Sequence, residues 1–215
     1  LGDSQRAWTL LPFQTPQAQQ DAPLHLRYSL LLIQMLKAWR EGQTSAAYTI
    51  ATEALTLANA FNNRFAQACA LVYRGHIQAD LQAWTAARED YQAALSIFTD
   101  LNAPAMSMEA QAGLALLALR QGDITAAQQA VEALLPLLTA EPYAVTTPVF
   151  TYLACYAVLA ADHDPRAATV LQQGYTWLQQ TAAGLDDKIR RHFLEVVPSH
   201  RALMMAYREW QLRGA

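Results

Sequence analysis

A tight turn followed by the start of a helix is indicated by the stretch Gly122-Asp-Ile-Thr-Ala-Ala127. The same form occurs earlier in the chain, in Gly42-Gln-Thr-Ser-Ala-Ala47. Midway between them, Gln82-Ala-Trp-Thr-Ala-Ala87 keeps the register without the glycine. The closing alanine belongs to a column that recurs at every fortieth position: Ala7, Ala47, Ala87, Ala127 and Ala167. Five positions in register indicate an internal repeat.

Further columns follow these alanines. Residues able to pack stand four positions later, at Leu11, Ala51, Tyr91, Val131 and Leu171, and eight positions later, at Leu55, Leu95, Leu135 and Tyr175. Apolar side chains at i, i+4 and i+8 form one face of an α-helix. A helix pair that repeats at a constant spacing, with a glycine or polar turn, is typical of an α-solenoid. We expect the alanine where the two helices cross, because a larger side chain there would overpack the joint by about 1–3 kcal/mol.

The composition agrees with an all-α chain. Hydrophobic residues make up 53% and charged residues 15%, which excludes a disordered chain. The net charge of −3 gives no general attraction to nucleic acid. The apolar run Leu30 to Ile33 is broken by Gln34 and Lys37 and falls far short of the ~18 residues of a membrane span. The chain starts without a signal peptide or an initiator Met, so we expect a fragment of a longer, cytoplasmic protein.

The columns predict three parts. Residues 1–23 would form half a repeat, with a helix over 3–11, and then a loop from Pro12 to Pro23. Residues 24–182 would form four antiparallel helix hairpins. Their first helices run over roughly 24–40, 64–81, 104–121 and 147–161, and their second helices over roughly 44–60, 84–100, 124–139 and 165–181. Residues 183–215 would form a helical cap, with Asp186 and Asp187 at one helix start and Pro198 at another.

From residue 2 to about residue 180 the chain resembles the tetratricopeptide repeat family, which implies a superhelical α-solenoid. Fragments of the family pattern W-x2-L-G-x2-Y are present at Leu71 with Gly75 and at Leu114 with Ala115. The closing proline of the family is replaced by Asn59, Thr99, Thr139 and Gln179. The repeat is about six residues longer than the usual 34. This longer repeat, and the ending from Phe193 to Arg201, look like the C-terminal arms of bacterial signal-transduction ATPases and transcriptional activators.

Patterns of catalysis, metal binding and cofactor binding are missing from the sequence. The five histidines are scattered, with no H-E-x-x-H, G-x-S-x-G, Walker lysine loop or dinucleotide fingerprint. His163, in Asp162-His-Asp-Pro, is interpreted as part of an exposed turn rather than as a metal ligand. Cys69 and Cys155 are interpreted as buried thiols in a reducing compartment. We therefore expect no enzyme, no metal and no cofactor.

Basic residues cluster only mildly, at Lys188-Ile-Arg-Arg191 and from Arg208 to Arg213. We interpret both groups as solvated faces of the cap, so that no direct contact with nucleic acid is expected.

The resemblance implies that first helices line a concave binding surface. Projecting the repeat onto it selects these candidate residues: Trp39, Arg40, Tyr73, His76, Asp80, Arg120, Tyr152 and Tyr156. Arg40, Asp80 and Arg120 keep the same spacing as the alanine column and would form an alternating charge ladder if the repeats stack. Alternatively, the arginines merely complement helix dipoles. Tyr152 and Tyr156 also fit core packing between repeats.

The expected function is protein–protein interaction, as the regulatory arm of a larger bacterial signalling or transcription-regulatory protein. Its partner would be a protein or peptide, or the effector domain of the parent protein, and no membrane is involved. The alternative is a sensor whose concave groove binds a small-molecule effector or a short peptide.

Overall fold

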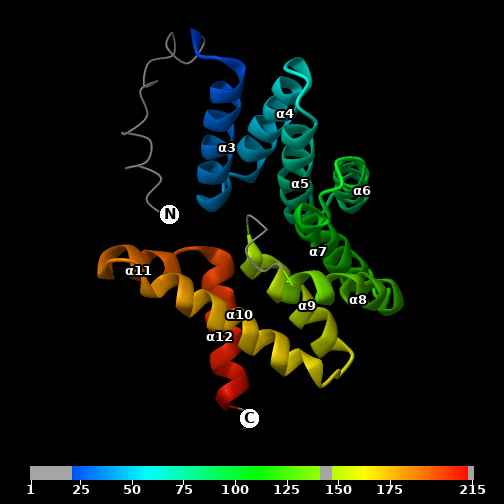
Figure 1. The fold of residues 1–215 in the computed structure, drawn as a ribbon, viewed down its shortest axis with the longest axis vertical. Helices are drawn as coiled ribbons and strands as arrows, with labels where there is room; N and C mark the ends of the chain where they lie inside the picture. Colours follow the sequence, from blue (N-terminus) through cyan, green and yellow to red (C-terminus); the bar gives the residue numbers. More distant parts are fainter. Residues whose placement is uncertain (1–20, 141–146, 213–215) are drawn as a thin grey trace. The chain divides into compact units, whose positions relative to one another are not determined.

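The computed structural model describes residues 21–140 and 147–212, which form ten α-helices and no strand (Figure 1). The chain divides after Leu101 into two compact units. The helix expected over residues 3–11, most of the loop after it and Arg213 lie outside the described residues. Within those residues, no helix has the length and apolar character needed to cross a membrane.

Unit 1, up to Leu101, contains two helix hairpins. The first consists of α3 (Leu24–Arg40) and α4 (Thr44–Ala60), and the second of α5 (Arg64–Asp80) and α6 (Trp84–Asp100). Three-residue turns join these helices, and α4 also packs against α5 (Figure 1). The first helices α3 and α5 start at positions 24 and 64, so each hairpin is one unit of the repeat seen in the alanine column.

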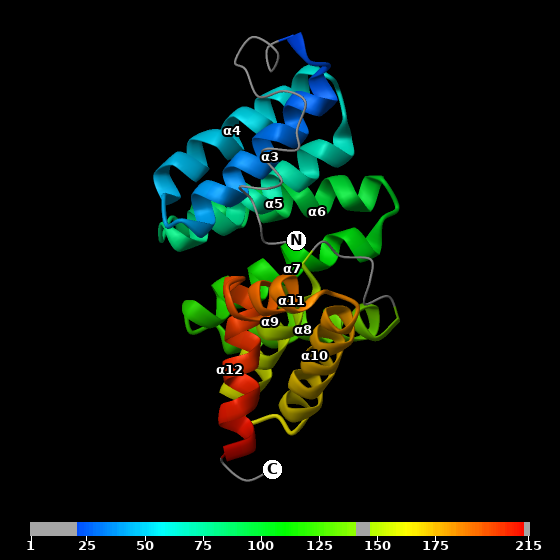
Figure 2. The same cartoon turned by 90° about the vertical axis from the view of Figure 1, so that its left-hand side faces the viewer.

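Unit 2 contains two more hairpins and a cap (Figure 2). Its six helices are α7 (Pro104–Arg120), α8 (Ile124–Ala140), α9 (Pro148–Ala161), α10 (Arg166–Ala183), α11 (Asp187–Glu195) and α12 (Pro198–Leu212). Helix α9 packs against α7, α8 and α10, and α12 packs against α10, α11 and α9. The all-α fold of helix hairpins with a helical cap is confirmed, and the helix boundaries lie within two residues of those predicted for the hairpins.

The cap begins as its sequence predicts. The side chain of Asp186 accepts a hydrogen bond from the backbone N–H of Ile189 (3.0 Å), which caps the start of α11. Pro198 is the first residue of α12, where its missing N–H removes no helical hydrogen bond. Leu203 and Tyr207 of α12 are buried in the core that α12 shares with α10.

The second helix of each hairpin buries one stripe, led by the alanine column. Ala47, Ala87, Ala127 and Ala167 are all buried, as are the residues four positions later. The column eight positions after the alanines, however, is only half-buried. The buried positions are instead seven and eleven places after each alanine: Ala54 and Ala58, Ala94 and Phe98, Leu134 and Leu138, Gly174 and Leu178. Steps of four, three and four follow the period of the α-helix, about 3.6 residues per turn, more closely than steps of four.

The helix ends share one backbone device. A residue with positive φ stands at every twentieth position, at Gly42, Asn62, Gln82, Asn102 and Gly122. At Gly42, the next N–H bonds the carbonyl of Ala38, and the glycine N–H bonds that of Trp39. This pair of bonds is the Schellman motif, and it satisfies carbonyls that the helix end leaves open. At the last hairpin the residue is His163, one position later than the repeat spacing predicts.

Candidate functional site

The C-terminal ends of α3 and α5 bring together three of the candidate residues. The indole N–H of Trp39 donates a hydrogen bond to Oδ2 of Asp80 (2.7 Å). The Trp39 ring also stacks on the imidazole of His76, with ring centroids 6.0 Å apart and planes 12° apart. Asp80 is exposed and Trp39 is half-buried. Two residues from successive hairpins thus fix a carboxylate at the surface of unit 1.

Beneath this surface lies a buried aromatic cluster. A hydrogen bond of 2.7 Å links Nδ1 of His76 to the hydroxyl group of Tyr91 on α6. The Tyr73 ring meets the same imidazole edge-on, at 6.5 Å between centroids. Gly75 makes room for Tyr91, because a Cβ at this position would lie 2.7 Å from its ring. The side chains of Trp39 and His76 therefore connect the exposed carboxylate to the core of the hairpin.

Burial corrects part of the predicted concave surface. Tyr73 and His76 were expected on an open face, and Tyr152 either there or in the core, but the exposed fractions of the three side chains are only 8%, 5% and 5%. The reason is that their helices contact neighbouring helices on several sides. Tyr152 packs against Gly174, where a Cβ would lie 2.9 Å from that of Tyr152. Core packing, the alternative considered for this tyrosine, is thus what the structure shows, and Tyr156 lies half-buried beside the same core.

The three charged candidates are all exposed at the last turns of their helices. In the described part of unit 1, no ion pair joins Arg40 to Asp80, which accepts the Trp39 indole instead. Arg120 belongs to unit 2. The alternating ladder that would link all three therefore stays a prediction.

A buried ion pair inside the second hairpin was not predicted. Arg74 of α5 donates to both carboxylate oxygens of Asp90 on α6, at 2.7 and 2.6 Å. Its hydrogen bond with Asp90 raises the pKa of the Arg74 guanidinium. Asp90 stands three positions after Ala87, on the edge of the buried stripe. A charged residue at such a position was a signal that the carboxylate needs a partner.

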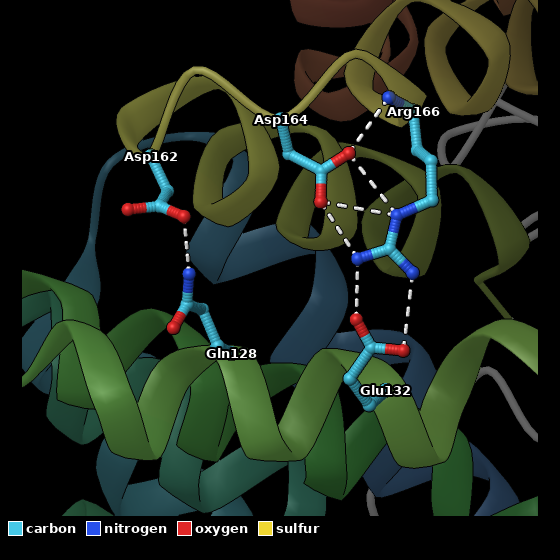
Figure 3. A network of polar contacts seen from close by, with 5 residues as sticks. All are labelled: Gln128, Glu132, Asp162, Asp164 and Arg166. Atoms are coloured by element: carbon cyan, nitrogen blue, oxygen red, sulfur yellow. Dashed lines mark hydrogen bonds and ion pairs between the residues drawn. The ribbon is translucent and has the colours of Figure 1, made fainter.

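A second polar network joins α8 to the turn before α10 (Figure 3). Arg166 forms ion pairs with Glu132 and with Asp164, and Gln128 donates to Asp162. Hydrogen bonds from Arg166 lower the pKa of both Glu132 and Asp164 below the usual range of carboxyl groups. The side chains of Arg166 and Glu132 are about half exposed and that of Asp164 is 19% exposed, so the network is a surface ion-pair network between neighbouring helices.

His163 is exposed in this turn, as predicted, and its φ is 56°. In residues 21–140 and 147–212, the structure groups no three His, Cys, Asp or Glu side chains that could hold a metal ion.

The two cysteines differ in their surroundings. Cys155 is buried, and burial raises the pKa of its thiol to about 12, which disfavours the reactive thiolate. Cys69 is only half-buried, which corrects the expectation of two buried thiols. Neither forms a disulfide bond within the described residues.

Comparison with known proteins bears on the fold. No family model matches the chain, and no curated protein sequence matches it significantly. Among solved structures, the chain is similar to the crystal structure of BtubC (BKLC) from P. vanneervenii, with a TM-score of 0.62 and 18% sequence identity. The match covers 86% of this chain and 76% of BtubC. At this identity the likeness supports the helical fold and assigns no activity.

Proposed function

We propose that this chain is a protein-interaction module of the tetratricopeptide type, which binds a peptide segment of another protein or of its parent protein's effector domain. The proposal includes its role as the regulatory arm of a larger bacterial signalling or transcription-regulatory protein. The observation that carries it is the exposed Asp80 carboxylate, fixed by Trp39 on a repeated array of helix hairpins. Repeat arrays present extended surfaces that suit peptide recognition.

Trp39 and Asp80 have the character of an interface centre. Tryptophan contributes heavily to binding energy in many interfaces, because it offers a large apolar surface and one N–H donor. Here the indole N–H already has its acceptor and the ring rests on His76, so the side chain is ordered before a partner arrives. Such preorganisation reduces the entropy that binding costs.

Selection from a random peptide library displayed on phage tests this proposal. We expect enriched peptides that bind the chain and lose at least about tenfold in affinity, which equals ~1.4 kcal/mol, with Trp39→Phe or Asp80→Asn. Glu53→Gln is the matched control, because Glu53 is an exposed acid on the second helix of the first hairpin. Peptides that bind all four proteins equally would contradict this site.

The competing function is the sensing of a small-molecule effector. A metabolite screen by thermal shift distinguishes the two, because a ligand that binds the folded state raises its melting temperature. A metabolite that raises it by several degrees, together with a peptide selection that enriches nothing, would overturn the interaction module.

A further inference from the structure

The turn between α5 and α6 departs from the turns of the hairpins directly before and after it at three consecutive positions. The equivalent positions read Arg40-Glu41-Gly42 and Arg120-Gln121-Gly122 in the hairpins before and after it. The middle turn reads Asp80-Leu81-Gln82 instead. Its backbone is nevertheless the same, because Gln82 has a φ of 60° and the N–H of the next residue bonds the carbonyl of Gln78.

Each of these three departures is unfavourable for the fold. A carboxylate at the end of a helix opposes the helix dipole, whereas arginine at that position complements it. Leu81 leaves 44% of its surface exposed to solvent. Gln82 adopts the left-handed conformation that glycine adopts without strain. Local rules that are broken together, at an exposed turn, indicate a functional position rather than a structural one.

The Asp80 carboxylate is also positioned with one oxygen available. Oδ2 accepts the Trp39 indole N–H, and among the described residues Oδ1 has no hydrogen-bond partner. The helix end adds partial negative charge at the same place. The half-buried Trp39 ring is in contact with this charge, and Leu81, the next residue along the chain, exposes apolar surface. Negative charge beside aromatic and aliphatic surface is the combination that binds an organic cation.

We propose that Asp80, Trp39 and Leu81 bind the guanidinium group of an arginine in a partner peptide. This inference rests on the proposed function and names the chemistry that its site recognises. A guanidinium is planar, donates to carboxylate oxygens and stacks on aromatic surface, whereas an ammonium group is a compact, strongly hydrated charge. Lys37 and Arg40 of α3 lie in the last turn beside Trp39, so they repel a strongly basic segment. The site therefore takes a single arginine rather than a polybasic stretch.

The experiment is a titration of the whole chain, followed by NMR of the tryptophan indole N–H groups. The probe is N-acetylarginine amide, and its neutral isostere N-acetylcitrulline amide is the control ligand. The sequence contains five tryptophans, and the signal of Trp39 is assigned by its loss in Trp39→Phe. We expect a saturable shift of the Trp39 signal with the arginine derivative, and at least tenfold weaker binding with citrulline.

Variants define the site further. Asp80→Asn abolishes the saturable shift, Leu81→Gln weakens the binding, and Glu53→Gln leaves it unchanged. Equal shifts with arginine and citrulline, no saturation, or tighter binding of N-acetyllysine amide would overturn the inference. If displayed peptides depend on Trp39 but need no arginine, the proposed function stands and this inference fails. If no peptide binds at all, the proposed function itself fails.

Discussion

The second helices and the first helices of the hairpins are buried in different ways. Each second helix buries one stripe, led by an alanine of the repeat column, and exposes the opposite face. The first helices α5 and α7 are buried on most of their sides. A one-sided helix shows its buried face in the spacing of its apolar residues, whereas a helix enclosed on most sides also buries residues outside that spacing. The contrast explains why the repeat is clearest in the second helices.

The largest loss of stability should come from removing Asp90, the charged residue at the edge of the buried stripe of α6. Asp90→Ala leaves Arg74 without its partner in a mostly buried place, and we expect a loss of about 3 kcal/mol in the free energy of unfolding. Urea denaturation followed by circular dichroism measures it. Glu89→Ala, at the exposed neighbouring position, should change stability by less than about 0.5 kcal/mol. Similar losses in both variants would show that α6 is not one-sided.

The alanine column offers a direct test of the buried stripe. Ala47 is fully buried and Ala46, its neighbour on α4, is exposed. We expect Ala47→Leu to destabilise unit 1 by about 1–3 kcal/mol, because the larger side chain overpacks the crossing of α3 and α4. Ala46→Leu should change stability by less than about 0.5 kcal/mol in the same urea titration. Ala103, which lies in the turn before α7, is a poorer control because it is half-buried.

One substitution should make the turn between α5 and α6 as favourable for stability as the glycine-containing turn between α3 and α4. Gln82→Gly removes the strain of a non-glycine residue with positive φ, and we expect a gain of about 0.5–1 kcal/mol in stability. Thermal denaturation measures this gain. The reciprocal change Gly42→Gln should cost a similar amount, since Gly42 has a φ of 76°. A loss of stability with Gln82→Gly would mean that the glutamine side chain stabilises the turn.

The ion pairs on the exposed faces of the second helices should contribute least to stability, and only above acidic pH. Arg166 lowers the pKa of Glu132 and of Asp164 in the folded state, so the network stabilises the fold above the unfolded pKa of about 4. That contribution is lost as the pH falls through the lowered folded pKa values. We expect Arg166→Gln to lower the melting temperature slightly at pH 6 and by less at pH 2.5. A difference that is constant over this pH range would contradict the ion pairs.

The sequence predicted the helices because alanine spacing and turn residues are local signals. It missed the enclosure of α5 and α7, since burial on most sides depends on which helices lie next to them. For the same reason it placed Tyr73 and His76 on an open face, although both are buried. The contact between Trp39 and Asp80 could have been predicted, because their separation in the sequence is one residue more than the repeat spacing. The pairing of Arg74 with Asp90 needed the actual crossing of two helices.

Hairpins that share a length need not be exchangeable. In the α5–α6 hairpin the glycine is on the first helix, Gly75, and the tyrosine that fills its space is on the second, Tyr91. In the α9–α10 hairpin the order is reversed, with Tyr152 on the first helix and Gly174 on the second. A helix moved from one hairpin to the other would place a side chain against a tyrosine that leaves no room for it, or would leave the space beside a glycine unfilled. Each helix therefore packs well only against the other helix of its own hairpin. A recombined array would keep the repeat spacing but lose this complementary packing.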